Sequence, residues 1–248
     1  WGVGYDKIDV AAAKRRGIPV AIAAGMNAVP VAEHAVALML AVYRRIPFLD
    51  RKLRGGTWLK QEMRTVCRQL KGKTVGLLGM GNIGRELARK LSVFDVQVIY
   101  HDVRRLDEAT EQARSVRYVP FEQLLAESDI LSVHVPLLES TRGLVGREAI
   151  AKMKDGTVII NTARGGVVDE TALYEALTSG KLFGAGIDTY ADEPPAADNP
   201  LFALEEVVLT PHTGGVVVDN VANVTKCVFE NMQRLLRGEP ITPGCQVA

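Results

Sequence analysis

A glycine-rich turn, set between an apolar run and an amphipathic helix, most constrains how this chain can fold. Residues 74–78 form a short apolar run of strand length, and the next six residues, 79–84, read Gly-Met-Gly-Asn-Ile-Gly. Beyond this turn, apolar residues recur at the spacing of an amphipathic helix, at Ile83, Leu87, Leu91 and Phe94. The order of strand, tight turn and helix predicts a βα unit.

Segments of strand and helix character alternate along the rest of the chain. We expect strands at residues 74–78, 96–100, 130–135, 158–161, 185–188 and 207–210. Residues 18–21 can form an edge strand at most, because Pro19 has no backbone N–H to donate. Helices are expected at 31–54, 83–94, 121–127, 149–153, 170–177 and 220–236. Repeated βα units predict a mostly parallel, doubly wound α/β sheet of the Rossmann type.

The glycine turn matches the fingerprint of a dinucleotide-binding site. Gly79 permits the tight turn, Gly81 lets a pyrophosphate approach the backbone, and Gly84 lets the helix pack closely on the strand. The pyrophosphate would lie on the unpaired N–H groups at the start of the helix. Asp102 ends the next strand at roughly the expected 20 residues and can accept hydrogen bonds from the ribose hydroxyls.

Asp102 favours NAD over NADP, because a carboxylate at this place repels a 2′-phosphate. Arg104 and Arg105 leave the other cofactor open as an alternative. Two guanidinium groups in that position can hold a 2′-phosphate.

Polar residues follow three later strands, at the edge where doubly wound sheets bind ligands. Together with other segments they resemble the D-isomer-specific 2-hydroxyacid dehydrogenase family, which includes phosphoglycerate, glycerate and D-lactate dehydrogenases. The motifs that carry the resemblance span essentially the whole chain in the family's order: residues 2–9, 32–34, 79–84, 134–136, 161–170, 193–194 and 211–215.

The resemblance implies a role for each polar residue. His212 would be the general acid/base, because histidine has the side chain whose ordinary pKa lies nearest neutrality. Glu193 would hydrogen-bond the other ring nitrogen and fix the tautomer, although the adjacent Asp192 is an alternative partner. Arg164 would bind the substrate carboxylate or carbonyl oxygen, and Asp188 would accept a hydrogen bond from the nicotinamide carboxamide.

The resemblance also implies NAD as the cofactor and a small D-2-hydroxy acid or 2-keto acid as the substrate. His134 has a competing structural interpretation because it ends a strand, and His34, inside the long helix, is expected to be structural. The residues expected to contact NAD are Gly79, Gly81, Asn82, Ile83, Gly84, Asp102, His134, Pro136, Thr141, Thr162, Ala163, Arg164, Asp188, His212, Gly214 and Gly215.

The family pattern divides the chain into three parts. Residues 1–8 are expected to be the last strand of a substrate-binding domain, 9–213 the NAD-binding domain, and 214–248 a helix and return segment. Because the chain begins at Trp1 rather than Met, we expect the natural N-terminus to be absent. We also expect a homodimer formed through the cofactor domain, partly by the long helix.

Composition argues against several other kinds of binding partner. Lys and Arg number 30 and Asp and Glu number 29, and this net charge of +1 argues against nucleic acid or an anionic membrane. The most apolar stretch, 28–42, is too short to span a bilayer. Cys67, Cys227 and Cys245 are widely spaced, which indicates free thiols in a cytoplasmic protein. No residue cluster has metal-ligand spacing.

Two alternatives stand beside an NAD-dependent dehydrogenase. One is a non-enzymatic NAD-sensing module, like the transcriptional corepressors that share this fold and the three polar residues. The other is a formate dehydrogenase, which is disfavoured because that subgroup has glutamine where Glu193 stands.

Overall fold

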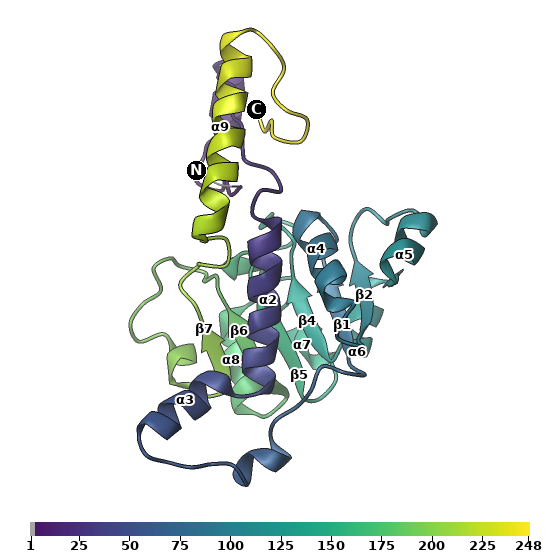
Figure 1. Cartoon of the computed structure of the whole chain (residues 1–248), viewed down its shortest axis with the longest axis vertical. Helices are drawn as coiled ribbons and strands as arrows, with labels where there is room; N and C mark the ends of the chain where they lie inside the picture. The colour runs from purple at the N-terminus through teal and green to yellow at the C-terminus, as the bar shows by residue number, and fades with distance from the viewer. Residues whose placement is uncertain (1–2) are drawn as a thin grey trace.

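A computed structural model describes residues 3–248. Within this range the chain forms one parallel sheet of seven strands in the order β3-β2-β1-β4-β5-β6-β7, which confirms the predicted doubly wound architecture (Figure 1). The strands are β1 (Thr74–Leu78), β2 (Gln97–His101), β3 (Val116–Tyr118), β4 (Ile130–Val133), β5 (Thr157–Asn161), β6 (Leu182–Ile187) and β7 (Val207–Leu209).

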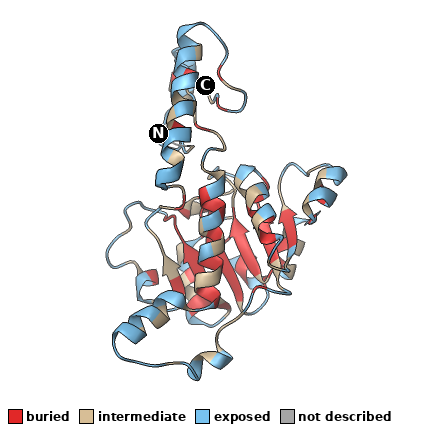
Figure 2. Ribbon diagram, viewed as in Figure 1, coloured by how far each residue is buried: buried red, intermediate tan, exposed pale blue. Residues whose placement is uncertain are grey.

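The central strands are mostly apolar because helices cover both faces of the sheet. One face packs on α2 (Ala28–Tyr43) and α4 (Asn82–Leu91), and the other packs on α6 (Phe121–Glu127), α7 (Arg147–Ala151) and α8 (Glu170–Thr178). Along β5, Val158 and Ile160 face α2 and α4, whereas Ile159 faces the other helices. The buried residues therefore concentrate in and around the sheet (Figure 2).

The long helix expected at residues 31–54 is two helices, so that prediction is wrong in its extent. The chain breaks after α2 and resumes in α3 (Ile46–Arg54), with Arg45 in the left-handed region at φ 53°. Pro47 has no N–H to donate back to the Tyr43 carbonyl. That carbonyl instead accepts a hydrogen bond of 2.9 Å from the backbone N–H of Arg68.

Two further short elements follow β2 and were not predicted. They are α5 (Glu108–Arg114) and β3, which pairs with β2 at the edge of the sheet. Strand β3 has three residues, too few for a periodic pattern to be visible. The Asp107 side chain caps α5 by accepting from the Thr110 N–H.

The two ends of the chain lie together beyond the carboxyl edge of the sheet. Helices α1 (Val10–Arg15) and α9 (Val221–Leu236) stand there as a column (Figure 1). The C-terminal segment pairs with the N-terminal one through Ile22 N–H to Cys245 O, 2.8 Å, and Val247 N–H to Val20 O, 2.8 Å.

The strand expected at residues 1–8 is absent from its described part, 3–8, which forms turns and bends; Trp1 and Gly2 lie outside the described residues. Residues 18–21 contribute only an isolated antiparallel bridge between Ala21 and Gln246. Neither segment joins the parallel sheet: the backbone hydrogen bonds of residues 3–8 are local, and those of Val20 and Ile22 go to the other terminus of the chain.

Candidate active site

The glycine turn lies where the strand order reverses, between β1 and β4. This switch point is where doubly wound sheets bind nucleotides. Gly79 has φ 102°, a conformation that favours glycine, and a Cβ there would approach the carbonyl carbon of His134 to 2.8 Å. The turn is anchored by hydrogen bonds from Gly79 N–H to His101 O and from His134 N–H to Leu78 O.

The other two glycines of the turn have different surroundings. A Cβ on Gly84 would overlap the Gly79 carbonyl oxygen, so this position needs glycine for the helix to pack against the turn. A Cβ on Gly81 would meet no atom within 4 Å among the described residues. Gly81 is also the N-cap of α4, and its position offers no side chain to the N–H groups of the first turn. A pyrophosphate fits this open, uncapped helix end.

Asp102 faces the same turn from the end of β2. Its Oδ2 accepts from Met80 N–H at 2.6 Å, and its Oδ1 accepts from Arg104 N–H at 2.9 Å. Arg105 forms two hydrogen bonds of 2.9 Å with Glu111. Arg105 is one of the two residues that could hold the 2′-phosphate of NADP. Because its guanidinium is already paired with Glu111, the geometry favours NAD.

Arg164 follows β5 and is fixed by its own turn. The Asn161 side chain donates from Nδ2 to Arg164 O at 2.9 Å and accepts from Ala163 N–H at 3.1 Å. Arg164 itself donates from Nη1 to Ala163 O at 2.6 Å and from Nε to Asp6 Oδ2 at 2.9 Å. Gly165 sits so close to the backbone of Tyr190 that a Cβ would overlap it. The arginine turn therefore touches the segment that carries Glu193.

His212 and Glu193 form a hydrogen-bonded pair. His212 Nδ1 lies 2.8 Å from Glu193 Oε2, and Glu193 Oε1 accepts from Tyr190 N–H at 3.1 Å. Glu193, and not Asp192, is thus the partner in this structure. His212 has φ 54°, which is uncommon for a residue other than glycine. Residues with such strained backbone angles cluster at functional sites. Its side chain is 45% exposed, so the ring remains accessible on its other side.

Asp188 is buried between these groups, at the end of β6. Burial alone would raise the pKa of Asp188, but hydrogen bonds from His34, Thr210, Gly214 and Thr213 lower it to about 2. The Thr210 hydroxyl donates to Oδ1 at 2.6 Å, and the N–H groups of Thr213 and Gly214 donate at 2.8 and 2.9 Å. The carboxylate is therefore ionised at neutral pH and organises the loop after β7.

Two other predicted residues, His134 and Thr162, each have a buried polar side-chain atom without a hydrogen-bond partner among the described residues. Burial lowers the pKa of His134 to about 4, which keeps its imidazole neutral, and its Nε2 lies 2.8 Å from Ser132 Oγ. Among the described residues, His134 Nδ1 and Thr162 Oγ1 are buried without a hydrogen-bond partner. Buried polar atoms are rarely left unpaired, so both observations fit a bound group at this edge of the sheet. The residues present thus fit NAD.

The remaining predicted positions line the same edge. Thr141 closes a turn by donating to Pro136 O at 2.6 Å and accepting from Leu138 N–H at 2.8 Å. Gly214 and Gly215 follow His212, and a Cβ on Gly214 would come within 2.9 Å of Asp188 Oδ2. Asn82 and Ile83 begin α4, and Ala163 lies in the Arg164 turn.

Sequence reasoning missed several residues that hold this site together. Asp6 contacts Arg164 across 158 positions of the chain, and Thr210 and His34 contact Asp188 from two other elements. Asp6, His34 and Asn161 lie in motifs that carry the family resemblance. Their contacts, however, could not be found without knowing which segments meet.

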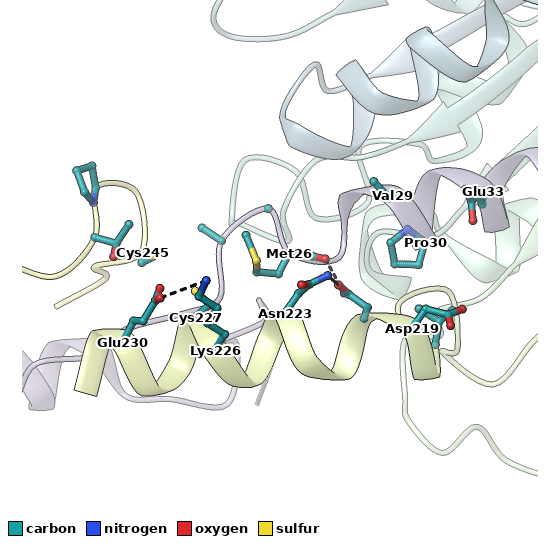
Figure 3. A pocket seen from close by; sticks show the side chains of 16 residues that line it. Met26, Val29, Pro30, Glu33, Asp219, Asn223, Lys226, Cys227, Glu230 and Cys245 are labelled. Carbon is teal, nitrogen blue, oxygen red and sulfur yellow. Dashed lines mark hydrogen bonds and ion pairs between the residues drawn. The ribbon is translucent and has the colours of Figure 1, made fainter. Parts of the chain in front are cut away.

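A cavity elsewhere in the molecule is lined by none of the predicted site residues. It lies between the start of α2 and α9, beside Met26, Pro30, Asn223, Cys227 and Cys245 (Figure 3).

All three cysteines are free thiols. In residues 3–248 no group of three or more His, Cys, Asp or Glu is placed to hold a metal ion. No helix in that range is long and apolar enough to cross a membrane.

Comparison with known proteins identifies relatives of this site. The model of the D-isomer specific 2-hydroxyacid dehydrogenase NAD binding domain matches residues 36–214. The chain is 43% identical over 240 residues to a D-3-phosphoglycerate dehydrogenase of Archaeoglobus fulgidus, covering 97% of the chain and 45% of that protein. It is 46% identical over 215 residues to a hydroxypyruvate reductase of Thermotoga maritima, covering 86% of the chain and 68% of that protein.

A solved structure extends this comparison to the fold. A glyoxylate reductase from Paecilomyes thermophila superposes with a TM-score of 0.91 at 37% identity, over 99% of this chain and 73% of the other. The chain thus spans less than half of the phosphoglycerate dehydrogenase and about two thirds to three quarters of the two reductases.

Proposed function

Because this chain belongs to the D-isomer specific 2-hydroxyacid dehydrogenase family, we propose that it transfers a hydride between NAD and a small D-2-hydroxy acid or its 2-keto acid. The observation that carries the proposal is the His212–Glu193 pair, 2.8 Å apart at the ligand-binding edge of an NAD-binding sheet. A glutamate, not the glutamine of formate dehydrogenases, stands beside this histidine.

His212 is proposed as the general acid/base. A carboxylate can only accept hydrogen bonds, so the contact with Glu193 requires the proton on Nδ1 and leaves Nε2 free. With a neutral ring, Nε2 can take the proton from the hydroxyl of a 2-hydroxy acid; in the reverse direction the doubly protonated ring gives its Nε2 proton to the carbonyl oxygen of a 2-keto acid. Glu193 itself accepts a hydrogen bond from Tyr190 N–H, and this fixed carboxylate keeps the His212 ring from rotating.

Arg164 is proposed to bind the substrate anion. Within residues 3–248, its Nε and Nη1 donate to Asp6 and Ala163, and Nη2 is proposed to bind a substrate carboxylate or carbonyl oxygen. A guanidinium in this place stabilises negative charge that develops on the carbonyl oxygen. Asp6 and Asn161 fix its direction.

NAD supplies the hydride acceptor and, when reduced, the hydride donor of the reaction. The residues proposed to hold it surround the glycine turn and the strand ends. Gly81 and the start of α4 would receive the pyrophosphate, Asp102 the adenosine ribose, and Asp188 the nicotinamide carboxamide. Further proposed contacts are Gly79, Asn82, Ile83, Gly84, His134, Pro136, Thr141, Thr162, Ala163, Arg164, His212, Gly214 and Gly215.

We also propose how the chain divides into domains. Residues 9–213 would form the NAD-binding domain, while 1–8 and 214–248 would belong to a substrate-binding part. Support comes from the pairing of the two chain ends away from the sheet. We further propose a homodimer through the cofactor domain and a cytoplasmic location.

The test is a cofactor titration followed by a substrate panel. NADH and NADPH are titrated by nicotinamide fluorescence, and glyoxylate, hydroxypyruvate, pyruvate and phenylpyruvate are then added while absorbance is followed. The proposal predicts tighter binding of NADH and oxidation of NADH by at least one keto acid. Tight NADH binding without oxidation by any keto acid would refute hydride transfer by this chain while keeping the cofactor site, and failure to bind either cofactor would refute the cofactor site.

A further inference from the structure

Three polar side chains behind the loop that carries His212 are linked by hydrogen bonds in the order His34, Thr210, Asp188, and we call this hydrogen-bonded set the His34 row. His34 reaches there from α2, Asp188 from the end of β6, and Thr210 from the end of β7. His34 Nε2 is 2.9 Å from Thr210 Oγ1 and 3.5 Å from Asp188 Oδ1, and Thr210 Oγ1 is 2.6 Å from the same Asp188 oxygen. The Asp188 side chain is 2% exposed and that of His34 21%.

The protons in this row can be assigned from what each group is able to donate. Asp188 is an anion at neutral pH and only accepts hydrogen bonds. The Thr210 hydroxyl has one hydrogen, which the 2.6 Å contact directs to Asp188. Thr210 Oγ1 must therefore accept from His34, so the His34 Nε2 atom carries a hydrogen.

Asp188 in turn holds the catalytic loop. Its carboxylate accepts from the N–H groups of Thr213 and Gly214, and its backbone carbonyl accepts from His212 N–H at 2.8 Å. The packing is tight, because a Cβ on Gly214 would lie 3.3 Å from His34 Cδ2. A change at His34 is thus transmitted to the carboxylate and not absorbed by empty space.

We propose that His34 is a positioning residue for the nicotinamide half of the cofactor. Its Nε2–H holds Thr210, and Thr210 holds the Asp188 carboxylate in the orientation that accepts from the carboxamide. This inference rests on the proposed function, in which Asp188 contacts the nicotinamide. In this proposal His34 acts through Thr210 and Asp188, so its effect is specific to ligands that contain the nicotinamide ring.

The experiment compares NADH with ADP-ribose, which shares the adenosine and pyrophosphate but has no nicotinamide. Dissociation constants for both are measured by calorimetry on the full chain and on His34→Leu and His34→Gln. Leucine removes the donor, and glutamine keeps an N–H at a similar reach. We expect His34→Leu to bind NADH about tenfold more weakly, because the nicotinamide carboxamide loses its hydrogen bond to the charged Asp188 carboxylate, with ADP-ribose affinity unchanged. Glutamine should restore most of the NADH affinity.

A second variant keeps the proposal testable if His34→Leu does not fold. Thr210→Val removes the middle of the row and should lower NADH affinity without affecting ADP-ribose. Glu33→Gln, at a 62% exposed neighbour on the same helix that pairs with Lys90, is the matched control and should change neither constant.

The outcomes separate this inference from the function on which it rests. Equal weakening of NADH and ADP-ribose in His34→Leu would show a structural role only and overturn the inference. Unchanged NADH affinity in both His34→Leu and Thr210→Val would also overturn it. If the unmodified chain bound neither ligand, the proposed cofactor site would fail, and this inference with it.

Discussion

Replacing Asp188 with asparagine should reveal how strongly its partners stabilise a buried charge. The ordinary pKa of 3.8 is lowered to about 2, because hydrogen bonds from His34, Thr210, Gly214 and Thr213 outweigh the effect of burial. At about 1.4 kcal/mol per pKa unit, the ionised form contributes roughly 2 kcal/mol to the free energy of unfolding at pH 7. A folded pKa below the unfolded one means that this contribution is present above about pH 4 and lost as pH falls toward 2.

The assay is urea unfolding of the unmodified chain and of Asp188→Asn at pH 7 and pH 3. We expect the variant to be less stable by at least about 2 kcal/mol at pH 7, and the difference to shrink by about 1 kcal/mol at pH 3. Asp198→Asn, at an exposed carboxylate, is the control and should show no pH-dependent difference. A stability loss in Asp188→Asn that stayed constant from pH 7 to pH 3 would refute the reasoning.

Two further predictions concern the cofactor site. Glu111→Gln weakens the ion pair that holds Arg105, so NADPH affinity should rise several-fold relative to NADH in a fluorescence titration; an unchanged ratio would show that Arg105 does not set the preference. Gly84→Ala forces a Cβ against the Gly79 carbonyl and should lower the free energy of unfolding by about 1–3 kcal/mol, whereas Gly81→Ala should leave stability near that of the unmodified chain and weaken NADH binding. The reverse pattern in thermal melts and titrations would contradict the roles assigned to these glycines.

The parts of the site that the sequence predicted are those set by local chain geometry. The glycine turn was visible because strand, glycines and helix are adjacent in sequence, and their spacing is required by close packing at Gly84. Asp188 and His212 were expected at the ligand-binding edge because each follows a predicted strand, and their roles came from the family resemblance. In each case one element and its flanking residues contain the information.

The features that the sequence did not predict depend on contacts between distant segments. Pro47 was a local signal for the break before α3, but the Arg68 N–H that binds the Tyr43 carbonyl arrives through an irregular connection. The contact of Asp6 with Arg164 and that of His34 with Thr210 join residues 158 and 176 positions apart. Periodicity and spacing describe single elements, so they carry no signal for such pairs.

The central claim, that His212 transfers the proton in a hydride-transfer reaction, is tested most directly by His212→Asn. NADH oxidation by a 2-keto acid is followed in a single turnover, with the NADH dissociation constant measured in parallel and Asp192→Asn as the neighbouring carboxylate control. The account predicts a rate about 10²- to 10⁴-fold lower in His212→Asn, with NADH affinity within about twofold of the unmodified chain. Equal rates in His212→Asn and the unmodified chain would contradict it.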